Sequence, residues 1–436
     1  MTCEVKTKED KDRNIKKLCI ILGSLVIVIA LGFFIAEQVI NSVADAREKA
    51  EIKARNEKLQ TELITKAEKL YKGYYYDEAL ALLNENIKLE SKDDDRIKAE
   101  IAKIENAKSS LVKYEGSVEH VFFHSLIIYP ELAFDDKGHP AEGYNMWMTT
   151  VSEFKKMLPE LLKRGYVLYK LSDYIEMDSQ NKIKLKDIYL PPGKIPLVIS
   201  VDDVNYYEYM KLDGFAEKLV LDDKGRVSTQ VVTPGGETKI TRDGDVIPIL
   251  DDYVAKHPEF SWRGAKGTIA LTGYEGALGY RITDNLPSEK EDQQMVKKIA
   301  DKMKENGWLF ACHSYTHNGY FRTGKVTMAQ MRSDIDEWKQ KIEPWVGKTN
   351  IYISPFGYCL NNNDPRYRYI IESGFNIFCN VGNERKIIVN SDNIIMPRVN
   401  LDGFTMTNRK EEVNQHYFNV DDVIDTSRPL INDKLN

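Results

Sequence analysis

The chain has 436 residues, of which 42% are hydrophobic and 29% are charged, and its formal net charge is -6. This length and composition allow two or three folded units with a sizeable apolar core. The acidic balance offers no basic surface of the kind that binds nucleic acid, so we expect no nucleic-acid partner.

Residues 18–36 form an unbroken apolar run of the length that crosses a bilayer. Basic residues stand before this run, among them Lys16 and Lys17. Because Lys and Arg favour the cytoplasmic side, we expect residues 1–17 to form a cytoplasmic tail and the rest of the chain to be exported. The alternative is a cleaved signal peptide with residues 44–46 as its cleavage site, but the apolar region of a signal peptide is normally shorter. The sequence therefore predicts a single-pass anchor in the cell membrane that carries an extracellular domain.

Residues 41–112 have a helical composition, rich in Ala, Glu, Lys and Leu and without proline. Within this segment, residues 67–80 resemble one tetratricopeptide-like helical hairpin, with Gly73 where the helices approach and Ala79 and Leu80 packed between them. Only one such unit is visible, and repeat folds need about three units to be stable alone. We therefore expect a helical stalk, and a protein partner for this stalk stays open.

After residue 113, short apolar runs alternate with helical patterns at residues 151–164, 290–306 and 328–345. The seven apolar runs are residues 118–128, 165–171, 195–201, 267–271, 307–313, 350–354 and 375–379. Apolar strands separated by helices indicate a parallel sheet covered on both faces. The sequence predicts an α/β fold, a distorted (β/α) barrel of about seven parallel strands, in a catalytic domain at residues 116–420 with a C-terminal tail at 421–436.

The segment at residues 213–263 breaks this alternation and has a hairpin-like passage with a turn at Pro234-Gly235-Gly236. It follows the third predicted strand. We expect an insertion that lies near the mouth of the barrel and shapes substrate access.

Two motifs stand at the carboxyl ends of predicted strands. Asp202 and Asp203 follow the apolar run at residues 195–201, and His313 closes another run, with His317 four positions later. Neighbouring strand residues point to opposite sides, so the two carboxylates are expected to have different roles. Histidines four apart can meet on one face of a helical turn and bind a divalent ion. Because the carboxyl ends of barrel strands share one face, the sequence predicts that both motifs reach one metal site with positions open for water.

These motifs resemble the polysaccharide deacetylases with the NodB-homology domain, carbohydrate esterase family four, over residues 118–404. An acidic pair after an apolar strand, followed by His-Ser-x-x-His, is the family signature. Residues 120–127 look like the family's opening strand, residues 352–358 like its Tyr-Pro-Tyr-Gly loop, and residues 396–399 like its closing Pro-Arg-Ile segment.

The resemblance implies a role for each matching residue. Asp203, His313 and His317 would bind a divalent metal ion, zinc or else cobalt or nickel, and Asp202 would be the general base. The backbone N–H of Phe356 would stabilise the oxyanion.

A general acid must also protonate the departing amine. In the branch that resembles poly-N-acetylglucosamine deacetylases this acid comes from the first strand, which implies His124. His416 is the alternative, because it is the one histidine after His317.

The chain departs from the family pattern at two places. Val204 stands where the family has glycine, and no arginine precedes Ser354 to hold the base carboxylate. Arg398, in another predicted strand segment, is the candidate for that charge.

Other side chains carry secondary expectations. Trp147, Trp262 and Tyr274 are candidates for stacking on sugars, although isolated aromatic residues more often lie in the core. Three cysteines follow the apolar run, Cys312, Cys359 and Cys379. This odd number argues against a disulfide scaffold, and one bridge between Cys359 and Cys379 stays open.

The sequence thus implies a metal-dependent hydrolase that removes acetyl groups from N-acetylhexosamine units of a cell-wall or extracellular polysaccharide. Two alternatives remain at this point. One is a catalytically inactive glycan-binding scaffold at the cell surface. The other is a metal-dependent deacylase that acts on a smaller amide or an O-acetyl ester.

Overall fold

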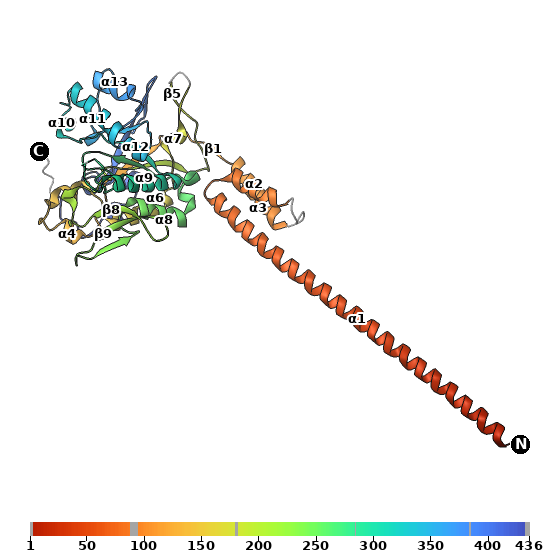
Figure 1. Cartoon of the computed structure of the whole chain (residues 1–436). Coiled ribbons are helices and arrows are strands. Elements are labelled where there is room, and N and C mark those ends of the chain that lie inside the picture. Colours follow the sequence, from red (N-terminus) through yellow and green to blue (C-terminus); the bar gives the residue numbers. More distant parts are fainter. Residues whose placement is uncertain (1–2, 88–94, 179–181, 284, 383–384, 432–436) are drawn as a thin grey trace. The chain divides into compact units, whose positions relative to one another are not determined.

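The computed structural model describes residues 3–87, 95–178, 182–283, 285–382 and 385–431 (Figure 1). The chain divides into two compact units. The first comprises Met1–Glu68 and Ala79–Ile101, and the second comprises Lys69–Glu78 and Ala102–Asn436.

The N-terminal helices are α1 (Cys3–Lys72), α2 (Tyr76–Ile87) and α3 (Asp95–Ser109). Helix α1 runs without interruption through the apolar residues 18–36, and this stretch is long and apolar enough to cross a membrane. A turn at Gly73 and Tyr74, whose φ is 65°, separates α1 from α2. Ala79 and Leu83 on α2 are fully buried, whereas Leu80 is half-buried.

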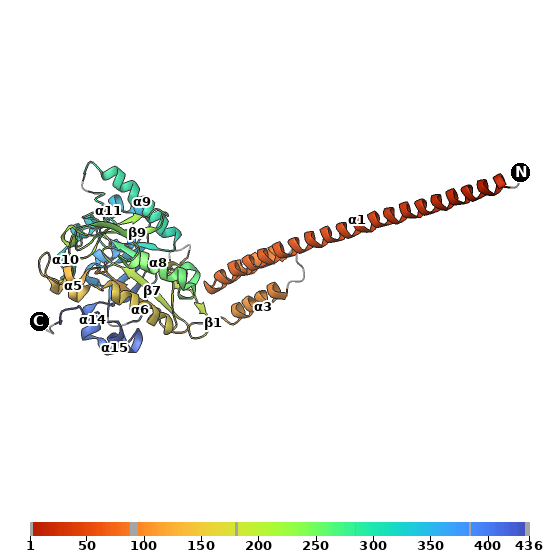
Figure 2. The ribbon, with the colours of Figure 1, turned by 90° about the horizontal axis from the view of Figure 1, so that it is seen from below.

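The second unit is built on a closed barrel of seven parallel strands (Figures 1 and 2). In spatial order these are β11 (Thr268–Leu271), β12 (Leu309–Cys312), β13 (Ile351–Ile353), β14 (Ile377–Val381), β16 (Ile394–Asn400), β2 (Glu119–Phe123) and β7 (Ile195–Val201). Pairing of β11 with β7 closes the ring. The predicted barrel of about seven parallel strands is therefore confirmed.

One of the seven barrel strands differs from the sequence prediction. The run at residues 165–171 forms β3 (Tyr166–Leu168), which pairs with the first half of β7 outside the ring, while β11 pairs with the second half. The seventh strand of the ring is instead β16, which was not among the seven predicted runs. Pro397 lies inside β16, and proline has no N–H to donate, so it weakens the strand pattern in the sequence.

Side chains alternate between the barrel interior and the layer between strands and helices. In β7, for example, Val198 belongs to an interior apolar cluster with Ile353 and Met396, whereas Leu197 and Ile199 pack in the outer layer. The interior cluster fills the amino end of the barrel. Towards the carboxyl end, the inward-facing positions become polar, with Ser200 in β7 and Asp202 directly after it.

Helices cover the outside of the barrel. Two of them begin with a capping box, which Thr150 and Glu153 form at α6 (Val151–Lys163) and Thr327 and Gln330 form at α11 (Met328–Lys341). The other helices are α4 (Pro130–Ala133), α5 (Ala141–Trp147), α7 (Leu171–Tyr174), α8 (Val246–Lys256), α9 (Glu289–Glu305), α10 (Gly319–Arg322), α12 (Glu343–Val346), α13 (Pro365–Glu372), α14 (Gly403–Asn408), α15 (Lys410–His416) and α16 (Val420–Val423).

The segment at residues 213–263 contains a three-stranded antiparallel sheet of β8 (Ala216–Leu221), β9 (Val227–Val232) and β10 (Thr238–Thr241). The turn between β9 and β10 is closed by a hydrogen bond from Gly236 N to Thr233 O. Helix α8 then returns to the outer layer. Leu278 links this sheet to the loop that follows β7, since its N–H donates to Val204 O and its carbonyl accepts from Leu219 N.

Short strand pairs complete the second unit. They are β1 (Val112–Lys113) with β6 (Tyr189–Leu190), β4 (Ile175–Met177) with β5 (Ile183–Leu185), and β15 (Ile388–Val389) on β16.

The C-terminal segment is more integrated than the predicted tail at 421–436. Arg428 donates to both carboxylate oxygens of Glu153 and to the carbonyls of Asn145 and Met148. Burying the Glu153 carboxylate requires the charge of Arg428, so this part of the C-terminal segment is packed beside α6.

Candidate active site

The acidic pair lies where β7 leaves the barrel. Asp202 continues the strand, because its N–H donates to Phe123 O at 2.8 Å, and its side chain is almost fully buried. Asp203 then adopts a left-handed backbone with φ of 58°. This reversal sends the two carboxylates in different directions, although non-glycine residues rarely adopt it.

Val204 explains one departure from the family pattern. Its side chain is fully buried and belongs to the main apolar core. The chain therefore gains apolar packing beneath the acidic pair at the position where the family has glycine.

The two histidines lie at the end of β12 in a tight loop. The prediction of a helical turn was wrong, because Ser314 and His317 have left-handed backbones with φ of 61° and 43°. The loop still brings the rings together, with centroids 4.9 Å apart. His313 Nδ1 lies 2.8 Å from Ile353 O, so Nδ1 carries the proton and Nε2 is free to bind a metal.

Asp203, His313 and His317 form a candidate metal site. One ligand atom from each lies within 4.8 Å of those of the other two. One carboxylate and two imidazoles are a donor set that suits zinc and related divalent ions and leaves positions open. These residues therefore fit the predicted ion.

Arg398 forms a two-pronged ion pair with Asp202. Its terminal nitrogens lie 2.7 Å and 2.9 Å from the two carboxylate oxygens, and both side chains are buried. Burial by itself raises the pKa of Asp202, but the guanidinium outweighs it and holds this pKa at about 2. Asp202 is therefore a carboxylate at neutral pH. Its Oδ2 lies 3.9 Å from His313 Nε2, beside the metal ligands.

A buried polar chain below this pair supports Arg398. The guanidinium donates to Ser200 Oγ at 3.0 Å, and the Ser200 hydroxyl lies 3.0 Å from His120 Nε2. Burial and the charge of Arg398 lower the pKa of His120 well below its usual value. His120 is thus neutral, and its Nε2 shares a hydrogen bond with the Ser200 hydroxyl. The sequence predicts no role for His120 or Ser200.

The two candidate acids lie at opposite ends of the barrel. His124 follows β2, and its Nε2 lies 4.0 Å from Asp203 Oδ2. His416 ends α15, and its carbonyl accepts from Tyr166, which pairs with the first residue of β7. Asp202 lies beyond the last residue of the same strand, so His416 is about 20 Å away along the strand direction.

Phe356 lies in a short turn, Pro355–Gly357, with a left-handed φ of 55°. Its ring is 45% exposed and its centroid lies 4.3 Å from that of His317. The N–H groups of Gly357 and Tyr358 donate to carbonyls of the turn, whereas the Phe356 N–H makes no hydrogen bond to any residue in the described part of the chain. This N–H is a candidate donor to a ligand.

Two further residues hold the metal ligands in place and were missed in the sequence. The Tyr207 hydroxyl donates to Asp203 Oδ1 at 2.6 Å. Asp334 on α11 accepts from the N–H groups of Tyr315 and Thr316, at 2.8 Å and 2.9 Å, and so fixes the histidine loop. The acidic pair by itself predicts neither contact. Tyr207 lies four residues after Asp203 in the same loop, whereas Asp334 is brought in by tertiary structure.

The aromatic candidates separate by location. Trp262 stacks between Tyr74 and Tyr169, at 4.9 Å and 6.2 Å, so it is packed against protein. Trp147 lies near Phe404 and is 40% exposed. Tyr274 stacks on Tyr207 and therefore lies beside the site.

The cysteines form no bridge. Cys312, Cys359 and Cys379 are all free, so the conceivable bridge between Cys359 and Cys379 is absent.

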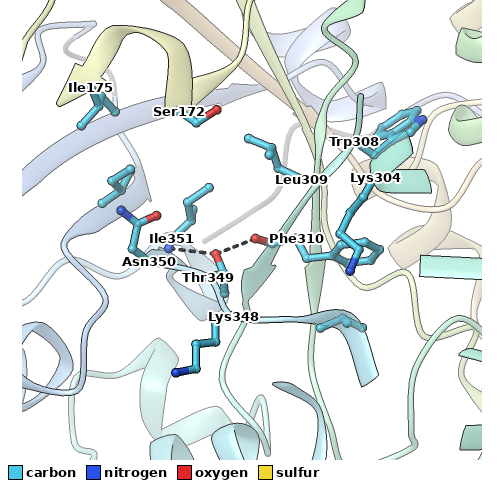
Figure 3. Close-up of a pocket in the computed structure, with 12 residues that line it drawn as sticks. Ser172, Ile175, Lys304, Trp308, Leu309, Phe310, Lys348, Thr349, Asn350 and Ile351 are labelled. Carbon is cyan, nitrogen blue, oxygen red and sulfur yellow. Dashed lines mark hydrogen bonds between the residues drawn. The ribbon is translucent and has the colours of Figure 1, made fainter. Parts of the chain in front are cut away.

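A cavity of about 510 Å³ lies away from these residues (Figure 3). It opens near the amino ends of β12 and β13, with Leu309, Ile351 and Thr349 in its wall and Lys304 and Lys348 at its edge. It contains no carboxylate or imidazole, so it offers none of the predicted chemistry.

Comparison with known proteins gives one family match. Residues 263–369 match the family model described as polysaccharide deacetylase, and this segment includes His313 and His317. No curated protein sequence matches the chain.

Three solved structures are similar at low identity. The Streptococcus pyogenes deacetylase PplD in complex with acetate is 14% identical, with a TM-score of 0.36 over 70% of this chain and 99% of its own. A de-N-acetylase from Aggregatibacter actinomycetemcomitans is 13% identical, with a TM-score of 0.39 over 68% and 99%. The BpsB deacetylase domain from Bordetella bronchiseptica is 13% identical, with a TM-score of 0.26 over 49% and 74%.

Proposed function

We propose that this chain, whose residues 263–369 match the polysaccharide deacetylase family model, removes acetyl groups from N-acetylhexosamine units of a cell-wall or extracellular glycan. The observation that carries this proposal is the convergence of Asp203, His313 and His317 beside the buried pair of Asp202 and Arg398.

Asp203, His313 and His317 would hold a divalent ion, and zinc is the ion we propose first. When bound, the ion lowers the pKa of a water molecule and polarises the acetyl carbonyl. The hydrogen bonds to Asp203 from Tyr207 and from His313 to Ile353 fix the directions of two of these ligands.

Asp202 is the proposed general base. It is charged at neutral pH, and Arg398 occupies both of its oxygens in a fixed orientation. It would take a proton from the attacking water as oxygen adds to the carbonyl carbon. The proton acceptor is therefore ready before substrate binds.

Phe356 and His124 would complete the reaction. The unpartnered N–H of Phe356 would donate to the oxyanion that develops on the carbonyl oxygen. His124 would protonate the nitrogen as the carbon–nitrogen bond breaks, which releases acetate and a free amine. Its place beside Asp203 supports His124 over His416 for this role.

The apolar stretch of α1 supports an anchor in the cell membrane. We propose a cytoplasmic N-terminus because Lys16 and Lys17 precede this stretch. The deacetylase domain would then face extracellular glycans.

Release of acetate from an N-acetylated glycan tests the proposal. We expect release by the purified chain with Zn²⁺, loss after chelation and recovery after metal is returned. Asp202→Asn should lower the rate by about 10³-fold, since general-base catalysis contributes about 10²–10⁴-fold. A fully active Asp202→Asn variant would show that the assigned mechanism is wrong.

A further inference from the structure

The loop that links Asp203 to Tyr207 is strained. Asp203 and Tyr206 have left-handed backbones, with φ of 58° and 51°. Between them, the Asn205 N–H donates back to Asp203 O at 2.6 Å and closes a tight turn. Non-glycine residues keep such backbones only where the surrounding structure imposes them. The groups that hold this loop therefore set the direction of the Asp203 carboxylate.

The side chain of Asn205 holds the loop from inside the protein. It is fully buried, and its Nδ2 donates to Thr272 O at 3.2 Å and to Gly276 O. Its Oδ1 accepts from the Thr272 N–H at 3.2 Å. Thr272 directly follows β11, which neighbours β7 in the barrel, so these bonds join the loop to the end of that strand. They use both the donor and the acceptor of one amide, and few side chains offer both.

The guanidinium of Arg281 also holds this loop. Its Nη2 donates to Tyr206 O at 2.9 Å, and its Nη1 donates to Asn205 O at 3.4 Å. Because Nη1 also donates to Glu275 O at 2.8 Å, one planar group serves the carbonyls of two loops. The ion pair of Arg281 with Glu208, at 3.4 Å, is more exposed and contributes less. Arg281 therefore acts mainly through the carbonyl oxygens.

We propose that Asn205 and Arg281 are positioning residues of the metal site. The peptide groups that they hold lie between Asp203, a metal ligand, and Tyr207, whose hydroxyl donates to that ligand. Both residues act through the backbone of the loop rather than through contact with the ion. Groups that orient metal ligands in this way control metal affinity. This inference rests on the proposed function and extends it, since it assigns the shape of the metal site to residues outside the ligand set.

Zn²⁺ affinity of the full chain in detergent tests the inference, measured by competition with a zinc indicator. Arg281→Met should lower the affinity by about 10–100-fold. Arg281→Lys keeps the charge but not the planar fork, so its affinity should fall as well. Asn205→Ser loses the amide and should also bind Zn²⁺ more weakly. The visible absorption of the Co²⁺-loaded chain depends on ligand geometry, and we expect it to change in all three variants.

Arg226→Met is the matched control, because Arg226 pairs with Asp222 in the turn between β8 and β9, outside the strained loop. It should keep the Co²⁺ spectrum and should keep Zn²⁺ affinity within about twofold, since surface ion pairs contribute little. Near-UV circular dichroism of the metal-free chains establishes that each variant is folded. If Arg281→Met does not fold, Arg281→Lys decides the outcome for Arg281.

Two negative results are distinguishable. An original chain that binds no Zn²⁺ contradicts the proposed metal site itself. An original chain that binds Zn²⁺, together with folded Arg281 and Asn205 variants that keep its affinity and its Co²⁺ spectrum, overturns the positioning role alone.

Discussion

The two ends of the barrel are formed by the same strands but differ in chemistry and in backbone conformation. At the carboxyl end, Asp203, His317 and Phe356 all have left-handed backbones and surround buried charge. At the amino end, Ile351 and Ile377 belong to an apolar cluster and line an open cavity, which is also lined by Lys304 and Lys348 (Figure 3). Strained residues persist where the surrounding structure imposes them, and they gather at functional sites. We therefore propose that the carboxyl end is organised for chemistry, whereas the amino end serves stability.

We expect the largest effect when His124 at the carboxyl end is compared with His416 at the amino end. His124→Gln removes an imidazole at the carboxyl end, and we expect a fall in kcat of about 10²–10⁴-fold, measured as acetate release. His416→Gln is the matched control at the amino end and should stay within about twofold. Equal losses in both variants would contradict the assignment of the two ends.

Arg398→Met should have the next largest effect. It leaves the buried Asp202 carboxylate unpaired, which destabilises the fold by about 3–5 kcal/mol in urea unfolding. Burial then dominates, so the pKa of Asp202 rises and a higher pH is needed to keep the base charged.

The acid limb of the pH–rate profile should therefore move to higher pH in Arg398→Met. Arg368→Met is a suitable control, because Arg368 pairs with Asp392 in a half-exposed position. An acid limb that stays in place in Arg398→Met would show that Arg398 does not set the charge of Asp202.

Asp334→Asn tests how the carboxyl end of the barrel is supported, and we expect it to have a smaller effect than the two changes above. The asparagine keeps one acceptor oxygen but loses the second for the N–H groups of Tyr315 and Thr316, so the loop that carries His317 loosens. Loss of such support lowers metal affinity by about 10–100-fold, which competition with a zinc indicator measures. Asp336→Asn on the same helix is the control, since Asp336 contacts Tyr369 instead. Unchanged zinc affinity in Asp334→Asn would show that Asp334 does not support the metal ligands.

The sequence predicts the barrel well because its strands are buried on both faces and therefore read as apolar runs. The apolar pattern alone misses β16, since Pro397 and Arg398 interrupt that pattern there. The metal ligands follow from motifs that close two strands. Asp334 lies on α11, away in the chain from the histidine loop that it supports, so no local pattern predicts its contact. The hydrogen bond from Tyr207 to Asp203 spans four residues of one loop, whose left-handed backbone at Asp203 and Tyr206 the sequence does not predict.

The helical turn proposed for the histidines fails for a related reason. A spacing of four residues fits one turn of helix, but it fits a tight loop equally well if left-handed residues bend the chain. Ser314 and His317 supply that bend, although non-glycine residues seldom adopt a left-handed backbone. Local propensity is therefore overridden by the tertiary contacts of the loop with Asp334.

Calorimetric titration of Zn²⁺ into the metal-free full chain in detergent tests the central claim most directly. The account predicts one ion per chain, unchanged stoichiometry in Asp202→Asn, and loss of binding in the double variant His313→Ala and His317→Ala. If the double variant binds Zn²⁺ as tightly as the original chain, then the carboxyl end of the barrel does not hold the metal site.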